Sequence, residues 1–210
     1  MTVERAALIR DAATLGLVID EPTADKLLVL LDELARWNQS YNLTAISDRR
    51  DMIVRHLLDS LAVRPLLKGL RIVDVGTGAG FPGLPLAIIE PARHFTLLDS
   101  NGKKVRFVAH AARTLGLNNV EPVHARAELY RPTAAFDTVV TRAFAPLPEL
   151  LDKVAGLCGS STRVLAMKGR RQIAEREDLP AGWQIESDVD LVIPGLDEAR
   201  HVITLRRIDS

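Results

Sequence analysis

The stretch Val73–Leu86, which reads VDVGTGAGFPGLPL, decides the fold of this chain. It begins in a short apolar run rich in β-branched residues, which is typical of a strand buried on both faces of a sheet. Four glycines follow, and because glycine lacks a Cβ atom, they can take positive φ and let a ligand reach the backbone N–H groups. The apolar residues at 84–89 then predict a helix that packs back on the sheet. The stretch therefore predicts a strand, a glycine loop and a helix, the first unit of a doubly wound α/β fold.

The segment 78–83 satisfies the pattern GxGxxG, which is found in dinucleotide-binding proteins. Asp99 ends the next apolar run, where a carboxylate can accept hydrogen bonds from ribose hydroxyls. This arrangement suits NAD and S-adenosylmethionine alike, and a tight turn without a ligand is a third interpretation. The pattern alone leaves all three open.

Two neighbouring features favour S-adenosylmethionine. Phe81-Pro82 separates the glycines from the helix, whereas a pyrophosphate binds best where the helix starts directly after its loop. Asp74, two residues before Gly76, would repel a pyrophosphate and attract the sulfonium and ammonium groups of S-adenosylmethionine. A nicotinamide-dependent oxidoreductase remains the alternative.

Length and composition limit the class of protein. The 210 residues fit one large domain or a domain with a small appendage, and a hydrophobic fraction of 47% supports a buried core. Cys158, the only cysteine, indicates a reducing compartment, and no signal-like segment or long apolar run is present. We therefore expect a cytoplasmic monomer without a membrane partner. Because Lys plus Arg equals Asp plus Glu at 27 each, any RNA site must be a local basic patch.

Periodicity predicts helices first and a βαβ alternation afterwards. Helices are expected at 2–17, 23–37 and 48–63, with an aromatic and amide-rich break at 37–44. Strands are expected at 70–75, 94–98, 120–124, 136–140, 162–167, 184–191 and 201–207, and further helices at 84–90, 102–115, 147–157 and 170–177. The last two strands should pair antiparallel at one edge, joined through Pro194-Gly195. The predicted fold is thus α/β, a seven-stranded mostly parallel sheet with an antiparallel edge strand. An N-terminal helical extension, 1–66, should pack on the domain 67–210 as one compact unit.

Charged residues at strand ends are candidates for ligand contact. Glu128 follows the third strand, where it either faces the ligand crevice or is an ordinary solvated charge. Arg142 follows the fourth strand beside the glycine loop, where a cation is costly unless a ligand or an ion pair compensates it. In the helix 48–63, Arg55, His56 and Asp59 share one side with Ser60.

Basic residues gather in three places that could bind RNA phosphates if they share one rim of the sheet. Their ordinary interpretation is a solvated surface. The RNA-binding candidates from these clusters are Arg49, Arg50, Lys103, Lys168, Arg170 and Arg171. The five histidines lack the spacing of metal ligands, so no metal is expected.

Four motifs together resemble the RsmG family, also called GidB, of bacterial 16S ribosomal RNA guanine-N7 methyltransferases. They are the loop Asp74–Leu86 with its FPG extension, WNQSYNLT at 37–44, HLLDS at 56–60 and TRAFA at 141–145. They occur in the family's order over nearly the whole chain. The resemblance implies a class I, Rossmann-like methyltransferase with S-adenosylmethionine as donor. It also implies that the acceptor is N7 of one guanine in the decoding-region loop of 16S rRNA, with 16S rRNA or a small ribosomal subunit precursor as partner.

Site residues follow from the resemblance by position. It places Gly76, Phe81, Ala127, Glu128 and Arg142 at the donor and Asp99 and Ser100 at its ribose, while the loop residues Asp74, Gly78 and Gly80 complete the donor site. Guanine N7 carries a lone pair and no proton, so methyl transfer needs placement rather than a general base. Asn42, His56 or Asp59 could orient the base. A catalytically silent RNA-binding module is a further alternative.

Overall fold

The computed structural model describes residues 2–142, 145–169 and 178–208. The predicted helix at 170–177 and the candidates Arg170 and Arg171 lie outside these residues. No helix within the described ranges is long and apolar enough to cross a membrane.

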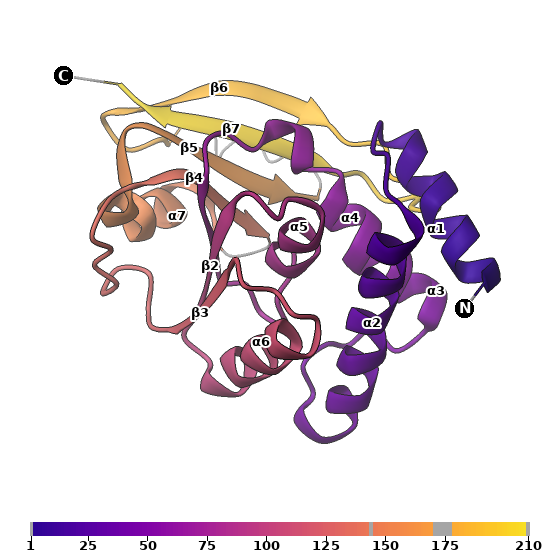
Figure 1. The fold of residues 1–210 in the computed structure, drawn as a ribbon. Coiled ribbons are helices and arrows are strands. Elements are labelled where there is room, and N and C mark those ends of the chain that lie inside the picture. The colour runs from indigo at the N-terminus through magenta and orange to yellow at the C-terminus, as the bar shows by residue number, and fades with distance from the viewer. Residues whose placement is uncertain (1, 143–144, 170–177, 209–210) are drawn as a thin grey trace.

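Seven strands form one sheet in the order β3-β2-β1-β4-β5-β7-β6 (Figure 1). Their bounds are β1 Arg71–Val75, β2 His94–Asp99, β3 Val120–His124, β4 Phe136–Arg142, β5 Cys158–Lys168, β6 Trp183–Asp190 and β7 His201–Arg207. Strands β1 to β5 pair in parallel, and β7 pairs antiparallel with both β5 and β6. The predicted topology is confirmed, with one refinement: the reversed strand β7 lies one place inside the edge, which β6 forms. Strand β4 is longer than predicted, so Arg142 is its last residue.

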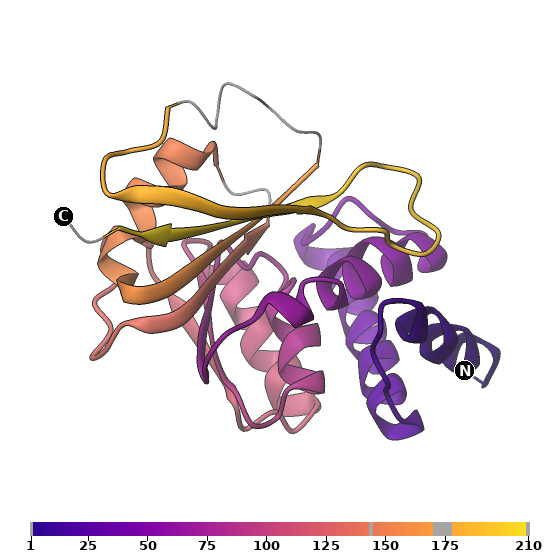
Figure 2. The ribbon, with the colours of Figure 1, turned by 90° about the horizontal axis from the view of Figure 1, so that it is seen from above.

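Both faces of the sheet are buried because successive residues of each central strand enter different hydrophobic clusters. Ile72 and Val140 join the cluster that contains residues of α5 (Gly83–Ile89) and α6 (Gly102–Thr114). Val73 and Val139 join a second cluster beneath α7 (Leu147–Val154) and the following 3₁₀ turn η3 (Ala155–Leu157). Figure 2 shows the sheet between these two helical layers.

The N-terminal helices extend the first of these layers. They comprise α1 (Thr2–Thr14), α2 (Glu21–Tyr41), the continuous helical segments α3 (Arg49–Met52), η1 (Ile53–Leu58) and α4 (Asp59–Leu61), and the 3₁₀ turn η2 (Arg64–Leu66). Leucines of α2 belong to the same buried cluster as residues of α5 and α6, and α2 packs against both helices. The extension is therefore built onto one face of the sheet domain, beside α5 and α6 (Figures 1 and 2).

The helix break predicted at 37–44 begins only after Tyr41 in the structure. Helix α2 continues to Tyr41 because Trp37 stacks on the Tyr41 ring, with centroids 5.2 Å apart, and also packs edge-on against Phe107 of α6. The helix ends at Asn42, whose φ of 50° is left-handed, a conformation that asparagine tolerates.

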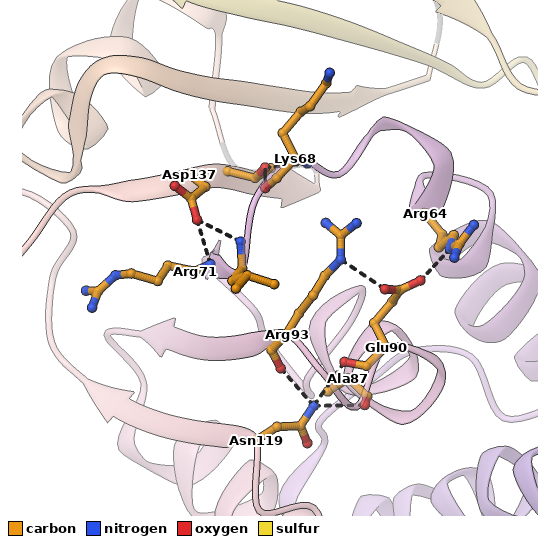
Figure 3. Close-up of polar contacts among 10 residues, drawn as sticks. Arg64, Lys68, Arg71, Ala87, Glu90, Arg93, Asn119 and Asp137 are labelled. Carbon is orange, nitrogen blue, oxygen red and sulfur yellow. Dashed lines mark hydrogen bonds and ion pairs between the residues drawn. The ribbon is translucent and has the colours of Figure 1, made fainter.

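The amino ends of the parallel strands are fixed by a polar network (Figure 3). Oδ2 of Asp137 accepts hydrogen bonds from the backbone N–H groups of Leu70 (2.7 Å) and Arg71 (2.8 Å), which fixes the start of β1 against β4. Nδ2 of Asn119 donates to three carbonyl oxygens at the end of α5 and in the turn before β2, those of Ala87, Glu90 and Arg93. Glu90 also forms ion pairs with Arg64 and Arg93. This edge is occupied by structural contacts, and the candidate site lies at the opposite, carboxyl edge.

Candidate active site

The glycine loop turns back over the end of β2. The N–H groups of Gly76 and Thr77 both donate to the Leu98 carbonyl, at 2.8 and 3.1 Å. Gly76, Gly78 and Gly80 have backbone φ angles of 69°, 61° and 88°, which residues with a side chain rarely adopt. A Cβ at Gly80 would also lie 2.3 Å from Cδ1 of Leu84. The loop therefore requires glycine for its own shape.

Asp74 lies beneath this loop and is completely buried. Its Oδ2 accepts hydrogen bonds from Oγ1 of Thr77 (2.6 Å) and from the N–H of Gly83 (2.8 Å). Burial raises the pKa of Asp74 to about 6, although the two hydrogen bonds oppose this shift. The expected direct contact between Asp74 and a cationic ligand is not supported, because its carboxylate holds the loop to the start of α5 instead.

The start of α5 offers no free N–H group to an anion. Gly83 donates to Asp74, Leu84 donates to the Gly80 carbonyl (2.7 Å), and Leu86 donates to the Pro82 carbonyl (3.2 Å). Residue 85 is proline and has no N–H. A pyrophosphate would need these donors at the helix N-terminus, so the geometry does not favour the dinucleotide alternative.

Asp99, the last residue of β2, contacts the loop and borders a cavity. Its Oδ2 accepts from the N–H of Gly78 (2.8 Å), and its Oδ1 accepts from the N–H of Asn101 (2.7 Å). Each carboxylate oxygen retains a lone pair that can accept from a ribose hydroxyl. Asp99 thus lies at the end of β2, as predicted, and lines a cavity with oxygens that can still accept hydrogen bonds.

The cavity beside Asp99, called here the first cavity, has a volume of about 280 Å³ and lies at the carboxyl ends of β1, β2 and β4. Six of the predicted donor residues line it: Gly76, Asp99, Ser100, Ala127, Glu128 and Arg142. Gly78, Gly80 and Phe81 do not line it and shape the loop behind it, as does Asp74. Sequence reasoning did not assign Lys104 and Lys153 of its wall to the donor. Lys104 stands at the start of α6, directly after β2, a position that could have identified it.

A second cavity of about 350 Å³ adjoins the first, and Arg142 lines both. Its wall consists of Ile46, Arg55, His56, Asp59, Arg142, Met167, Lys168, Gly169 and Arg200. Arg142 donates from Nη1 to Oδ2 of Asp59 (2.9 Å) and to the Arg55 carbonyl (2.8 Å). The guanidinium of Arg142 also lies 5.9 Å from the centroid of the Phe81 ring. The two sequence interpretations of Arg142, ligand contact and structural ion pair, are therefore compatible.

His56 joins the second cavity to the glycine loop. Its ring stacks on Phe81 with centroids 4.7 Å apart, and its Nε2 lies 3.1 Å from Oγ1 of Thr44. Burial, together with the charge of Arg142, lowers the pKa of His56 to about 4. At neutral pH the imidazole is therefore neutral. It lies in the π-helical turn η1, an irregularity frequent at functional sites.

The remaining candidates are dispersed. Asn42 is exposed at the end of α2 and lines neither cavity. Arg49 forms ion pairs with Glu4 (3.0 Å) and Asp32 (2.9 Å), while Arg50 borders a separate hollow beside α1. Lys103 is exposed at the start of α6. Of the described RNA candidates, only Lys168 lines the second cavity, so the structure does not gather them on one rim.

The second cavity also contains Arg55, which the sequence groups with Arg49 and Arg50 in one of the three basic clusters, and Arg200, which belongs to none of them. Arg200 directly precedes β7, and Lys168 pairs with His201 across the antiparallel β5–β7 ladder. The predicted antiparallel pairing joined only the last two strands, so the neighbouring positions of Arg200 and Lys168 follow from the insertion of β7 between β5 and β6. Within the described ranges, no three His, Cys, Asp or Glu side chains are arranged to hold a metal ion.

Comparisons with known proteins agree with this geometry. A family model described as GidB, rRNA small subunit methyltransferase G, matches residues 23–203. Ribosomal RNA small subunit methyltransferase G of Cronobacter sakazakii is 44% identical over 191 residues, which cover 91% of this chain and 92% of that protein. The protein of the same name from Nitrosococcus oceani is 46% identical over 192 residues, which cover 91% and 90%.

Solved structures support the fold alone. A SAM-dependent methyltransferase from Aquifex aeolicus superposes with a TM-score of 0.56 at 18% identity, covering 76% of this chain and 94% of that one. TrmN from Thermus thermophilus gives a TM-score of 0.56 at 20% identity, covering 74% of this chain and 53% of that one. The fold is thus that of S-adenosylmethionine-dependent methyltransferases, and the resemblance carried by the four motifs is confirmed. The chain belongs to the GidB family of small-subunit ribosomal RNA methyltransferases.

Proposed function

We propose that this chain transfers a methyl group from S-adenosylmethionine to N7 of one guanine in 16S rRNA. The observation that carries the proposal is the shared wall: Arg142 borders both the first cavity, built like a donor site, and the second cavity, which is lined by cations. A donor and a nucleotide placed in the two cavities would meet at this residue.

The residues of the first cavity fit the donor. A Cβ built on Gly78 meets only the Gly76 carbonyl oxygen (3.9 Å) and Nζ of Lys104 (4.0 Å), so the loop leaves open space above it. Asp99 would accept hydrogen bonds from the ribose hydroxyls, and Glu128 and Ala127 after β3 would border the adenine. When bound, S-adenosylmethionine supplies an electrophilic methyl group.

The second cavity suits a guanine ring nitrogen because, among the described residues that line it, no side chain is free to act as a general base. His56 is neutral, and its Nε2 already contacts Thr44. Asp59 is held by Arg142 and lies 3.4 Å from Nε of Arg200. Guanine N7 carries no proton, so its methylation needs orientation and a polar wall, which these residues provide. His56 and Asp59, which line the second cavity, remain the candidates for orienting the base, while Asn42 lines neither cavity.

The proposal is tested by incubating the purified chain with methyl-labelled S-adenosylmethionine and either 16S rRNA or small-subunit particles that lack the modification. We expect 7-methylguanosine at a single position, identified by nuclease digestion and mass spectrometry. Labelling on an exocyclic amine or on ribose would refute the N7 assignment. Absence of labelling in both substrates would refute the activity.

A further inference from the structure

Glu198 holds two arginines at the mouth of the second cavity. Its Oε1 lies 2.9 Å from Nη2 of Arg55, and its Oε2 accepts a hydrogen bond from Nη2 of Arg200 at 3.1 Å. Arg55 belongs to η1, whereas Glu198 and Arg200 lie in the connection between β6 and β7. Two guanidinium groups from distant parts of the chain therefore converge on one carboxylate.

The two arginines are better placed for a ligand than Glu198 is. Both line the second cavity, and their side chains are only 32% and 21% exposed, whereas that of Glu198 is 52% exposed. An ion pair with an exposed carboxylate contributes little to stability, so it is easily exchanged. A backbone phosphodiester carries one negative charge and two non-bridging oxygens, as a carboxylate does, so the same two arginines can bind it through charge-assisted hydrogen bonds.

Ionic contacts through Asp59 connect Arg200 with Arg142, the residue that lines both cavities. Nε of Arg200 lies 3.4 Å from Oδ1 of buried Asp59, whose Oδ2 accepts from Arg142 at the border with the first cavity. A phosphate bound to Arg55 and Arg200 would thus lie near Asp59, whose carboxylate also contacts Arg142 at the border between the two cavities. This is the position expected for the backbone of a nucleotide whose base enters the second cavity.

We propose that Arg55 and Arg200 form a subsite for an RNA backbone phosphate next to the target nucleotide, and that Glu198 occupies this subsite when RNA is absent. The inference rests on the proposed function, since it requires an RNA base in the second cavity. Binding of RNA would exchange the Glu198 carboxylate for a phosphate at the same two guanidinium groups. Glu198 is then an intramolecular competitor of the substrate.

The test is the equilibrium affinity for a 16S rRNA transcript, measured with S-adenosylhomocysteine present so that no turnover is needed. We expect Glu198→Gln to lower the Kd for RNA about threefold or more. This is the change that follows when RNA no longer has to displace a weak surface ion pair. Asp197→Asn is the matched control because it removes the same charge one residue away. Asp197 is exposed and forms no ion pair with the part of the chain that the structure describes. In an Arg55→Gln background, the gain from Glu198→Gln should fall to that of the control.

Several results would overturn the subsite. They are weaker RNA binding by Glu198→Gln, an equal gain from Asp197→Asn, or a full gain retained in the Arg55→Gln background. Inorganic phosphate serves as a second probe: saturable binding of phosphate ion without any change in RNA affinity would assign the arginines to a free anion and contradict the proposal. Because these are binding measurements, a chain that binds RNA as expected but never methylates it would refute only the proposed function.

Discussion

Arg142 donates a hydrogen bond from Nη1 to Oδ2 of Asp59 over 2.9 Å, and this contact lies where the first and second cavities meet. Replacing Arg142 with glutamine removes a positive charge that borders both cavities. It also removes an ion-pair partner of the Asp59 carboxylate, whose side chain is only 3% exposed. We expect kcat/KM for rRNA methylation to fall about 10- to 100-fold, the range for losing a charge-assisted hydrogen bond. Steady-state kinetics at varied donor and RNA concentrations measure this loss. Unchanged kcat/KM would contradict the shared role of Arg142.

Gly78 and Gly116 form a matched pair for testing the glycine loop. Both have left-handed φ, 61° and 66°, and no atom outside their neighbouring residues lies within 4 Å of a Cβ built at Gly116. Valine at either position should therefore strain the backbone by at least about 1–2 kcal/mol. Only Gly78→Val extends a side chain towards Lys104, which lines the first cavity. We therefore expect it alone to weaken S-adenosylmethionine binding, about tenfold or more on the scale of a steric clash. Calorimetric titration distinguishes the two variants, and equal donor affinities would remove the loop from the donor site.

Asp74 should make stability depend on pH. Its folded pKa is raised from 3.8 to about 6, so the native state binds more protons than the unfolded state between these values. The contribution of Asp74 to the free energy of unfolding therefore falls as pH rises from about 4 to 6, by up to about 3 kcal/mol from the pKa difference. Asp74→Asn lacks this titration and keeps an acceptor for Thr77 and Gly83.

Urea unfolding of the wild type and of Asp74→Asn across this range isolates the effect. The variant should gain stability relative to the wild type as pH rises. A difference that does not change with pH would show that Asp74 titrates normally.

His56 should remain neutral throughout the physiological range. Burial lowers its pKa to about 4, whereas in the unfolded chain the imidazole titrates near 6.5. Its contribution to folding is thus lost as pH falls from about 6.5 towards 4, because the unfolded state then binds the additional proton. NMR titration of the His56 ring should show no midpoint between pH 5 and 8. A midpoint near 6.5 would mean that the ring is not buried against Phe81 in solution.

The strand, loop and helix around Val73–Leu86 could be predicted because they depend on local requirements. Glycine is needed at positive φ, and a continuous run of apolar residues is needed where both faces of a strand are buried. The end of α2 could not be predicted in this way. Trp37–Tyr41 stays helical because Trp37 packs on Phe107, a contact between residues distant in the sequence.

The site was only partly predictable for the same reason. Asp99, Glu128 and Arg142 follow strands of a fold whose ligand crevice is known, so their position at the first cavity follows from topology. Charge alone could not show that Arg49 is paired with Glu4 and Asp32 away from the cavities. Likewise, an acidic residue beside a glycine loop looks like a ligand contact until its burial beneath the loop is visible, as for Asp74.

The most direct measurement is a crystal structure of this chain with S-adenosylhomocysteine and a guanosine-containing oligonucleotide of the 16S sequence. We expect the donor product in the first cavity and the guanine in the second, with the thioether sulfur and guanine N7 facing each other beside Arg142. A base bound outside the second cavity, or a donor product bound outside the first, would contradict it.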